Sequence, residues 1–274
     1  MKTLLLTMDL EEFVTPAEIG MKVDKKEMFK ISIEGLKNFK KILDKHKELN
    51  VTFFTTWEFA EKVQKELKEI LKNGKHELAL HGLEHSLNYP QMKEKELIKI
   101  LSQAKINLEK KFKIKIKGFR APQMGTLDLK ILNKIGIKYD SSLHPTYIPG
   151  YRNQMFKTRK IYNKNGVYEV PVSVTPLFRL PFSWIWLRNM GLNYVKICSK
   201  LNLINSEYVN IYLHPWEFVD INIKPYNKNI FKLIIRKTGE DYFNLVDKLI
   251  EWYFRNDLKS MTINEYLEKK YGNK

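Results

Sequence analysis

Two histidines four residues apart, His81 and His85, are the first side chains in this sequence that could do chemistry. Imidazole is a common nitrogen ligand for zinc, and residues at this spacing can face the same side of one helical turn. Pairs of hydrogen-bonded structural histidines give the same pattern. A catalytic zinc site takes three protein ligands and keeps one position open. The third ligand should therefore come from the acidic group Asp9, Glu11 and Glu12, after the first apolar run.

The same residues also fit the pattern H-x-x-E-H, in which Glu84 would be the base of a zinc peptidase. That motif belongs within a regular helix. Here it follows the apolar run HELAL and contains Gly82, with Asn88 and Pro90 soon after. We therefore favour a metal site at the end of a strand over a peptidase site.

The elements that must position these residues alternate along the chain. Short β-branched or aromatic runs predict strands over 3–9, 51–56, 76–82, 117–122, 137–143, 167–173, 207–216 and 259–264. Apolar residues at helical spacing predict helices over about 32–49, 58–72, 92–112, 127–135 and 241–255. This order predicts a parallel sheet covered by helices, either open and doubly wound or closed into a barrel.

The positions of the polar residues favour the barrel. Each of five polar residues comes at the carboxyl end of a predicted strand, namely Asp9, His81, Arg120, Asp140 and His214. An α/β barrel assembles its site at that end from many strands, whereas an open sheet has one switch point and usually a glycine-rich loop. The sequence contains no GxGxxG. With no long linker or repeat, residues 1–274 are expected to form one domain.

Composition excludes several classes of protein. The 274 residues are 43% hydrophobic and 29% charged with one cysteine, unlike collagen-like, disulfide-scaffold or disordered chains. The net charge of +17 would attract nucleic acid, anionic lipid or an anionic substrate. The lysines are spread over the predicted helices, and neither an RNP nor a helix-turn-helix signature occurs, so no specific nucleic acid is expected.

The chain shows no sign of export or of a membrane span. Cys198 has no partner for an intrachain disulfide, and the apolar run at 4–8 is too short for a signal peptide, so a cytoplasmic location is expected. The segment 176–190 is an ordinary buried helix or, alternatively, a lid or interfacial patch. In the second case one set of side chains would meet acyl chains (Phe182, Trp184, Ile185, Trp186) and another the head groups (Arg179, Arg188, Lys196).

The order of the motifs resembles the polysaccharide deacetylases that share the NodB homology domain, a group of carbohydrate esterases with allantoinase-like relatives. The family's motifs resemble LTMDLEE, HGLEHS, GFRAPQMG and YLHPWEF, in that order. The resemblance covers most of the chain and implies a distorted (β/α) barrel of seven or eight parallel strands. Many members have two adjacent aspartates in the first motif, where this chain has Asp9 and Leu10. The Asp-x-Glu subgroup uses the later acid, which points to Glu11 as the metal ligand, with Glu12 as a substitute.

The resemblance and the residue chemistry imply a site with a divalent metal, most simply Zn²⁺, or else Co²⁺, Ni²⁺, Mn²⁺ or Fe²⁺. The expected metal ligands are Glu11, His81 and His85, the base Asp9 and the acid His214, with Arg120 holding Asp9 by a bidentate pair and Asp140 holding His214. Pro122 and Trp216 are expected to contact substrate. Structural alternatives remain: a helix cap for Asp9, an ion pair for Arg120, and a buried, satisfied His214.

The expected activity is hydrolysis of an N-acetyl or other N-acyl group on an amino sugar in a glycan, a lipid-linked sugar or a nucleotide sugar. The alternatives are an allantoinase-like hydrolase of another non-peptide C–N bond and a non-catalytic carbohydrate-binding barrel. A pure binder needs neither Asp9 nor His214. A carbohydrate is the expected partner, with peripheral contact to an anionic membrane or a lipid-linked substrate.

Overall fold

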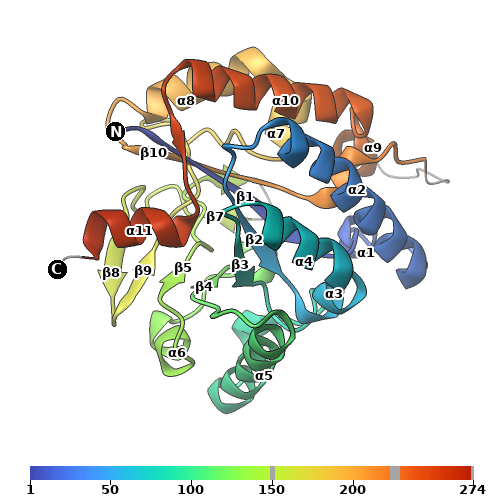
Figure 1. The fold of residues 1–274 in the computed structure, drawn as a ribbon, viewed down its shortest axis with the longest axis vertical. Coiled ribbons are helices and arrows are strands. Elements are labelled where there is room, and N and C mark those ends of the chain that lie inside the picture. The colour runs from blue at the N-terminus through green and yellow to red at the C-terminus, as the bar shows by residue number, and fades with distance from the viewer. Residues whose placement is uncertain (149–151, 223–228, 273–274) are drawn as a thin grey trace.

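A curled sheet forms the centre of the computed structural model, which describes residues 1–148, 152–222 and 229–272 (Figure 1). The strands are β1 (Thr3–Leu10), β2 (Val51–Thr55), β3 (Glu77–Leu80), β4 (Gly118–Phe119), β5 (Tyr139–Asp140), β6 (Tyr147–Ile148), β7 (Arg152–Asn153), β8 (Tyr162–Lys164), β9 (Val167–Glu169), β10 (Tyr208–Leu213) and β11 (Lys259–Ser260).

Helices cover the outside of this sheet. They are α1 (Thr15–Glu18), α2 (Lys25–Lys45), α3 (Trp57–Lys62), α4 (Gln64–Asn73), α5 (Glu94–Phe112), α6 (Leu129–Lys134), α7 (Ile185–Met190), α8 (Leu192–Asn202), α9 (Asn229–Ile235), α10 (Glu240–Arg255) and α11 (Ile263–Tyr271). Short 3₁₀ helices are η1 (Tyr89–Gln91), η2 (Pro122–Met124) and η3 (Pro215–Phe218). None of the helices in the described ranges is long and apolar enough to cross a membrane.

The main strand order is β10-β1-β2-β3-β4-β5-β9-β8, with β11 pairing with β1 outside this path. The pairs from β10 to β9 are parallel, and only the β8–β9 pair of this path is antiparallel. The mixed α/β fold is a deformed, mostly parallel barrel, which confirms the predicted fold class. The strand predicted at 259–264 shortens to β11, and the following residues begin α11.

The distortion lies where β9 meets β10. Pro171 has no N–H to give to a ladder, so a regular parallel pair cannot continue past β9. Instead Ser173 N donates to Asn210 O at 2.9 Å, and Asn210 N donates to Ser173 Oγ at 2.9 Å. The Asn210 side-chain amide donates to Pro171 O at 3.2 Å and to Ser141 Oγ at 3.1 Å. Hydrogen bonds of one asparagine therefore bridge the gap in the barrel.

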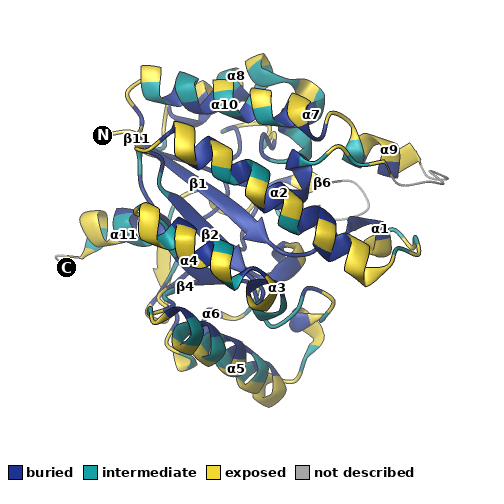
Figure 2. Ribbon diagram, turned by 45° about the vertical axis from the view of Figure 1, so that its right-hand side comes forward, coloured by how far each residue is buried: buried dark blue, intermediate teal, exposed yellow. Residues whose placement is uncertain are grey.

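Strand alternation divides the side chains of β1 between two environments. Leu4, Leu6 and Met8 pack in the large core between the sheet and the outer helices, whereas Leu5 belongs to a second cluster inside the barrel. Thr7 shares this inward face with Leu5. Figure 2 shows the result, with buried strands inside and helices whose outer faces are exposed. Residues at odd positions of β1 therefore point into the barrel.

Two helices differ from the sequence prediction. α2 begins at Lys25, where the Asp24 side chain accepts the N–H of Lys26 and caps the helix. The helix predicted over 58–72 is two helices, α3 and α4, because Val63 leaves the helical region at φ −117° and ψ 28°. Val63 is fully buried between them. The break lets both short helices turn an apolar side to the sheet.

The carboxyl-terminal helix closes the barrel at the amino ends of its strands. Met261, Ile263, Tyr266 and Leu267 pack in one cluster with interior residues such as Leu5. Figure 1 shows α11 at this end, near β8 and β9.

The side chain of Glu77 joins α11 to the strands at this end of the barrel. Its carboxylate accepts hydrogen bonds from Tyr139 Oη at 2.8 Å, Thr52 Oγ1 at 3.0 Å and the Asn264 N–H at 3.1 Å. Burial outweighs these donors and raises the pKa of Glu77 from 4.5 to about 7. Because the folded-state pKa lies above the unfolded value, the protonated form stabilises the fold at low pH and this contribution is lost as the pH rises through 7.

We expect Glu77→Gln to flatten the pH dependence of stability. Relative to this variant, the free energy of unfolding of the parent should fall by about 2 kcal/mol between pH 5 and pH 9. Urea unfolding at several pH values measures the difference. Glu48→Gln, at an exposed position, is the control and should follow the parent. Parallel pH curves for the parent and Glu77→Gln would show that this carboxyl group does not titrate with folding.

Candidate active site

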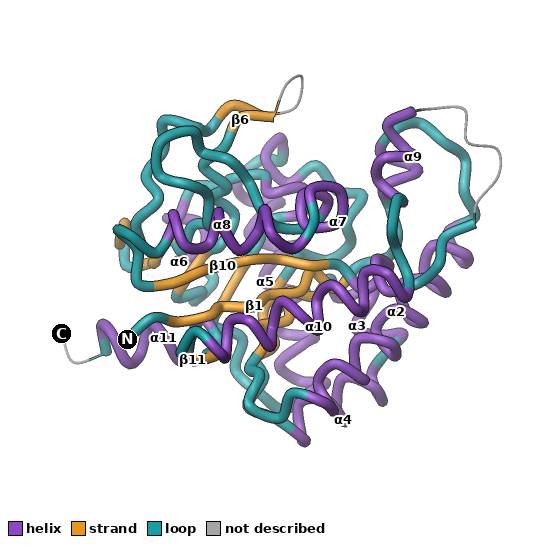
Figure 3. The backbone as a smooth tube through the Cα atoms, turned by 90° about the horizontal axis from the view of Figure 1, so that it is seen from above, coloured by secondary structure: helices purple, strands orange, loops and turns teal. Residues whose placement is uncertain are grey.

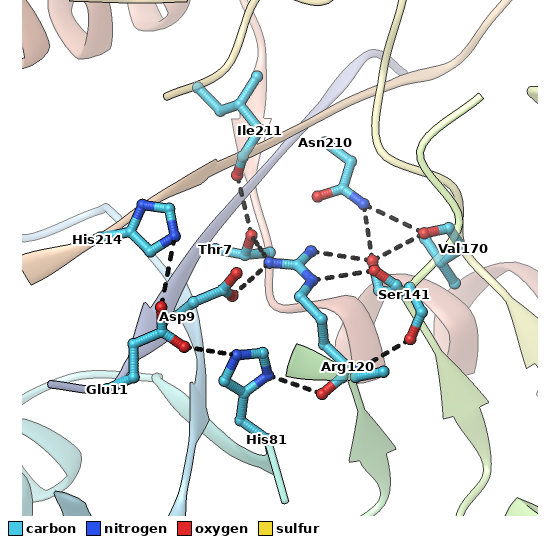
Figure 4. Close-up of polar contacts among 12 residues, drawn as sticks. Thr7, Asp9, Glu11, His81, Arg120, Ser141, Val170, Asn210, Ile211 and His214 are labelled. Carbon is cyan, nitrogen blue, oxygen red and sulfur yellow. Dashed lines mark hydrogen bonds and ion pairs between the residues drawn. The ribbon is translucent and has the colours of Figure 1, made fainter. Parts of the chain in front are cut away.

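Polar side chains from five strands meet at the carboxyl end of the barrel, as predicted. Asp9 lies near the end of β1, His81 follows β3, Arg120 follows β4, Asp140 ends β5 and His214 follows β10. All five are buried. Figure 4 labels four of them, Asp9, His81, Arg120 and His214, around one point of the barrel interior.

Arg120 organises the floor of this site. Its Nη1 donates to Asp9 Oδ1 at 2.7 Å and to Thr7 Oγ1 at 2.8 Å (Figure 4). Its Nε and Nη2 donate to the carbonyl and hydroxyl oxygens of Ser141 at 2.9 and 3.0 Å. The predicted Arg120–Asp9 pair therefore forms, but it is not bidentate, because the other N–H groups bind Ser141 and Thr7.

The loop that carries the two histidines is not helical. Gly82 adopts φ +95°, and a Cβ there would lie 2.4 Å from the Tyr89 hydroxyl, so glycine is required. The Tyr89 hydroxyl accepts the N–H of Leu83 at 2.8 Å and donates to Glu84 O at 2.7 Å. This tyrosine at the start of η1, which sequence reasoning missed, fixes the loop and thereby the position of His85.

Glu11, His81 and His85 form a buried group that could hold a metal ion. Their ligand atoms all lie within 4.8 Å of one another. His81 Nε2 is 2.9 Å and His85 Nε2 is 3.2 Å from Glu11 Oε2. Ligand atoms bound to one zinc ion at about 2.0–2.2 Å are separated by no more than about twice that distance. The spacing of this group therefore suits a single divalent ion.

The hydrogen bonding of His81 supports this fit. Its Nδ1 lies 2.7 Å from the carbonyl oxygen of Arg120. A carbonyl can only accept, so Nδ1 carries the proton and neutral His81 turns the lone pair of Nε2 toward Glu11. Burial also lowers the pKa of His81, which favours this neutral form. Two lone pairs at 2.9 Å need a proton or a cation between them, and the donor set could hold a metal ion there.

The other acidic residues of the first two motifs lie elsewhere. Glu12 is buried on the opposite side of the β1 extension, where Glu58 and Lys25 are its charged neighbours. Glu84 lies 3.9 Å from Lys25 and does not belong to the group that could hold a metal. Glu11, rather than Glu12, is thus grouped with the histidines. The non-helical loop also removes the basis of the peptidase interpretation.

His214 lies across the site between two carboxylates. Its Nε2 is 3.9 Å from Glu11 Oε1, and its Nδ1 is 3.5 Å from Glu217 Oε2. Burial alone would lower the pKa of His214, but the carboxylates of Glu217 and Glu11 outweigh it, so the pKa is raised. Its ring also stacks on Trp216 with centroids 5.6 Å apart.

Glu217, which the sequence analysis did not predict as a site residue, forms a buried ion pair with Arg188. Glu217 Oε1 accepts from Arg188 Nε at 2.8 Å, and its Oε2 accepts the N–H of His214 at 2.8 Å. Arg188 is fully buried and also donates to the carbonyls of Ile234 and Arg236. The predicted contact of Arg188 with lipid head groups is therefore wrong.

The predicted contact between Asp140 and His214 is wrong, and another carboxylate takes its place. Asp140 does not contact His214; it accepts from Ser142 Oγ at 2.5 Å and interacts with Glu169. Burial raises the pKa of both carboxyl groups, and each influences the other. Glu217 takes the place predicted for Asp140, because the 3₁₀ turn after β10 folds it back under His214.

A cavity of about 80 Å³ opens above these residues. It is lined by Asp9, Glu11, Thr15, Glu18, His81, His85, Gln123, Met124, His144, Ile148, Trp184, Tyr212 and His214. Pro122 and Trp216, predicted to contact substrate, are buried and are not among the lining residues. Pro122 instead begins η2, where Gln123 and Met124 both adopt φ 53°. Unusual backbone angles of this kind have no signal in the sequence.

Part of the segment 176–190 contributes to the site, and only its end is helical. Trp184 lines the cavity and lies edge-on to His214, with centroids 5.3 Å apart. Phe182 is fully buried, and α7 covers only the end of the segment.

Comparison with known proteins agrees with this geometry. Residues 32–139, which include His81, His85 and Arg120, match the family model described as polysaccharide deacetylase. A search of curated proteins finds no match to the sequence.

Solved structures share the fold. A probable polysaccharide deacetylase from Pseudomonas aeruginosa is 11% identical with a TM-score of 0.68, covering 98% of this chain and 91% of that one. The PuuE allantoinase is 13% identical with a TM-score of 0.66 and the same coverage. A CE4-family pseudoenzyme from Bacillus anthracis is 14% identical with a TM-score of 0.56, covering 96% of this chain. This chain spans 64% of that pseudoenzyme's length. Residues 32–139 thus match the polysaccharide deacetylase family model, and the deformed barrel of the whole chain is the fold of these solved structures.

Proposed function

We propose that the protein is a metal-dependent hydrolase that removes a small N-acyl group, most simply acetyl, from an amino sugar. The observation that carries the proposal is the cavity that Asp9 and His214 share with Glu11, His81 and His85. A carboxylate and an imidazole beside three metal-ligating groups form the set that amide hydrolysis needs.

Asp9 is assigned as the general base. Its Oδ1 is bound to Arg120 Nη1 at 2.7 Å, and the carboxylate borders the cavity. The guanidinium orients the carboxylate and balances its charge. The assignment leaves Glu11 to the metal.

His214 is assigned as the general acid. Its raised pKa favours the protonated ring, and Glu217 faces Nδ1 at 3.5 Å. Nε2 then points toward the Glu11 side of the cavity, where it can give a proton to the leaving amine.

Glu11, His81 and His85 would hold a divalent ion, which would supply a Lewis acid for the amide carbonyl and for water. Glu18 lies behind His85, with Oε1 3.9 Å from Nδ1, and accepts from Gln123 at 2.8 Å. Outer contacts of this kind orient imidazole ligands.

The size of the cavity suits a small acyl group. At about 80 Å³ the cavity has room for a few water-sized groups, which fits a short acyl chain. A sugar ring is larger and would lie across the mouth, beside Trp184 and Ile148. Aromatic side chains commonly border carbohydrate and ligand sites of this type.

The metal site predicts about one divalent ion per parent chain after reconstitution. His81→Ala/His85→Ala should lose it, because two of three ligands are removed. Mass spectrometry of the purified proteins measures the metal. His46→Gln/His76→Gln removes two histidines outside the site and should keep the ion. A parent chain that takes up no zinc, cobalt, nickel, manganese or iron would refute the proposed hydrolase.

The reaction predicts release of acetate from N-acetylated amino sugars. Asp9→Asn and His214→Ala should each lower the rate by about 10²–10⁴-fold, because each removes one proton-transfer group. An enzymatic acetate assay over monosaccharide, oligosaccharide and nucleotide-sugar substrates measures it. Hydrolysis of allantoin without acetate release would favour the allantoinase-like alternative. Sugar binding without turnover of a metal-loaded parent would favour the non-catalytic barrel.

The contact between Glu217 and His214 predicts that Glu217 positions the His214 ring. Glu217→Gln should lower kcat about 10–100-fold with little change in KM or metal content, because His214 loses its charged partner while the amide can still accept from Arg188. Steady-state kinetics separate the two constants. Glu84→Gln, a carboxylate outside the group that could hold the metal, is the control and should behave as the parent does. An unchanged kcat in Glu217→Gln would exclude the role.

A further inference from the structure

A second cavity, of about 490 Å³, lies away from the candidate active site. Its lining includes Tyr208, the first residue of β10, whereas His214 follows the last residue of that strand. Six residues of strand separate the two by about 20 Å. The second cavity is therefore at the opposite end of β10 and does not share the catalytic groups.

The second cavity is strongly cationic. Four basic side chains line it, Arg159, Lys160, Arg179 and Lys270, against one acidic residue, Glu207, which pairs with Lys270. This excess of positive charge suits an anionic ligand.

Two of the four basic residues, Arg159 and Arg179, differ in their hydrogen bonding. Arg159 donates to Val174 O at 3.0 Å, to Asn202 Oδ1 at 2.7 Å and to Asn205 Oδ1 at 3.0 Å, so it joins the segment after β9 to the end of α8. Arg179 has a buried Nη1 with no hydrogen-bond partner in the described part of the chain. Burial and the neighbouring charge of Arg179 lower the pKa of Arg159. A guanidinium beside a like charge with an unused donor is costly unless an anion binds it.

A tight hairpin over residues 174–181 presents Arg179. Val174 bridges with Pro181, and Thr175 N donates to Leu180 O at 3.2 Å. Arg179 adopts φ 54°, and its carbonyl accepts from Thr146 Oγ1 at 2.7 Å. A non-glycine residue in this region of backbone space is strained and is kept where the surroundings require it.

The tip of the same hairpin is apolar and exposed. Leu177 is 83% and Phe178 is 76% exposed, directly before Arg179. Two more exposed apolar residues, Leu201 and Ile204, lie at the end of α8 that Arg159 ties to this hairpin. Figures 1 and 3 show α8 running alongside β10. An apolar tip beside half-buried cationic groups is the pattern of a surface that meets both acyl chains and head groups of a membrane.

We propose that this face binds an anionic membrane lipid, with the lipid phosphate in the second cavity and Leu177 and Phe178 among the acyl chains. Arginine matches phosphate with paired N–H donors, and Arg179 has one buried donor unused. The net charge of +17 adds long-range attraction to the anionic surface. This replaces the patch expected from Phe182 and Arg188, which are buried.

Vesicle flotation tests the proposal with the full chain. The parent should bind phosphatidylglycerol vesicles and not phosphatidylcholine vesicles. Arg179→Gln should weaken binding about fivefold, the contribution of one basic residue at an anionic surface. Leu177→Ser/Phe178→Ser should weaken it at least tenfold, because two apolar side chains no longer leave water. The control Ile106→Ser/Lys110→Gln removes an exposed apolar residue and a lysine from α5 and should match the parent.

Further measurements separate the sources of binding. Near 0.5 M salt the nonspecific attraction is largely screened, whereas the loss in Leu177→Ser/Phe178→Ser should persist. If the parent, both variants and the control bound phosphatidylglycerol vesicles equally, the attraction would come from net charge alone. This result would overturn the proposal. Calorimetry with inorganic phosphate that shows binding to the parent but not to Arg179→Gln, without vesicle binding, would overturn the lipid and leave a soluble phosphate ligand. Metal content and thermal unfolding of each variant should equal those of the parent, which excludes misfolding as the cause.

Discussion

The burial of one guanidinium inside the barrel is the constraint on which the candidate site depends. Arg120 is fully buried, so each of its N–H groups must find an acceptor within the protein. Thr7 and Asp9 of β1 and Ser141, which follows β5, provide acceptors. The backbone carbonyl of Arg120 also accepts the Nδ1 proton of His81. One residue thus orients the proposed base through its side chain and a proposed metal ligand through its backbone.

A second buried arginine, Arg188, orients the proposed acid His214 on the other side of the site, and it does so through Glu217. Arg188 holds Glu217 at 2.8 Å, and Glu217 faces His214 Nδ1 at 3.5 Å. Breaking a buried ion pair leaves an uncompensated charge, which costs about 3–5 kcal/mol, so both carboxylates are held firmly. The two pairs differ in access to the cavity, because Asp9 lines it and Glu217 does not. The proposed base Asp9 could therefore exchange a proton with a bound molecule, whereas Glu217 would act only through His214.

The sequence was sufficient for features that follow from local rules. Strand ends with polar residues predicted the barrel and the meeting of Asp9, His81 and His214. Alternation along β1 also explains why residues 9 and 11 share a face. Contacts between distant segments could not be predicted in this way. The Arg188–Glu217 pair joins residues 29 positions apart, and it depends on how a turn after β10 packs against α7. Asp140 was misassigned for the same reason, since its neighbour Glu169 is placed by the β5–β9 pairing.

The layers of the barrel interior explain why so many polar groups can be buried at one end. Near the amino ends of the strands the interior is apolar and closed by α11, with Leu5 and Ile263 in one cluster. The next layer is the dense hydrogen-bonded shell of Arg120, Ser141 and Asn210 (Figure 4). In such low-dielectric surroundings a densely hydrogen-bonded network is rigid, because breaking one of its bonds would leave a costly unpaired group. A rigid floor in turn keeps Asp9 and the Glu11–His81–His85 group in place before any ligand arrives, which lowers the reorganisation needed for chemistry at the mouth.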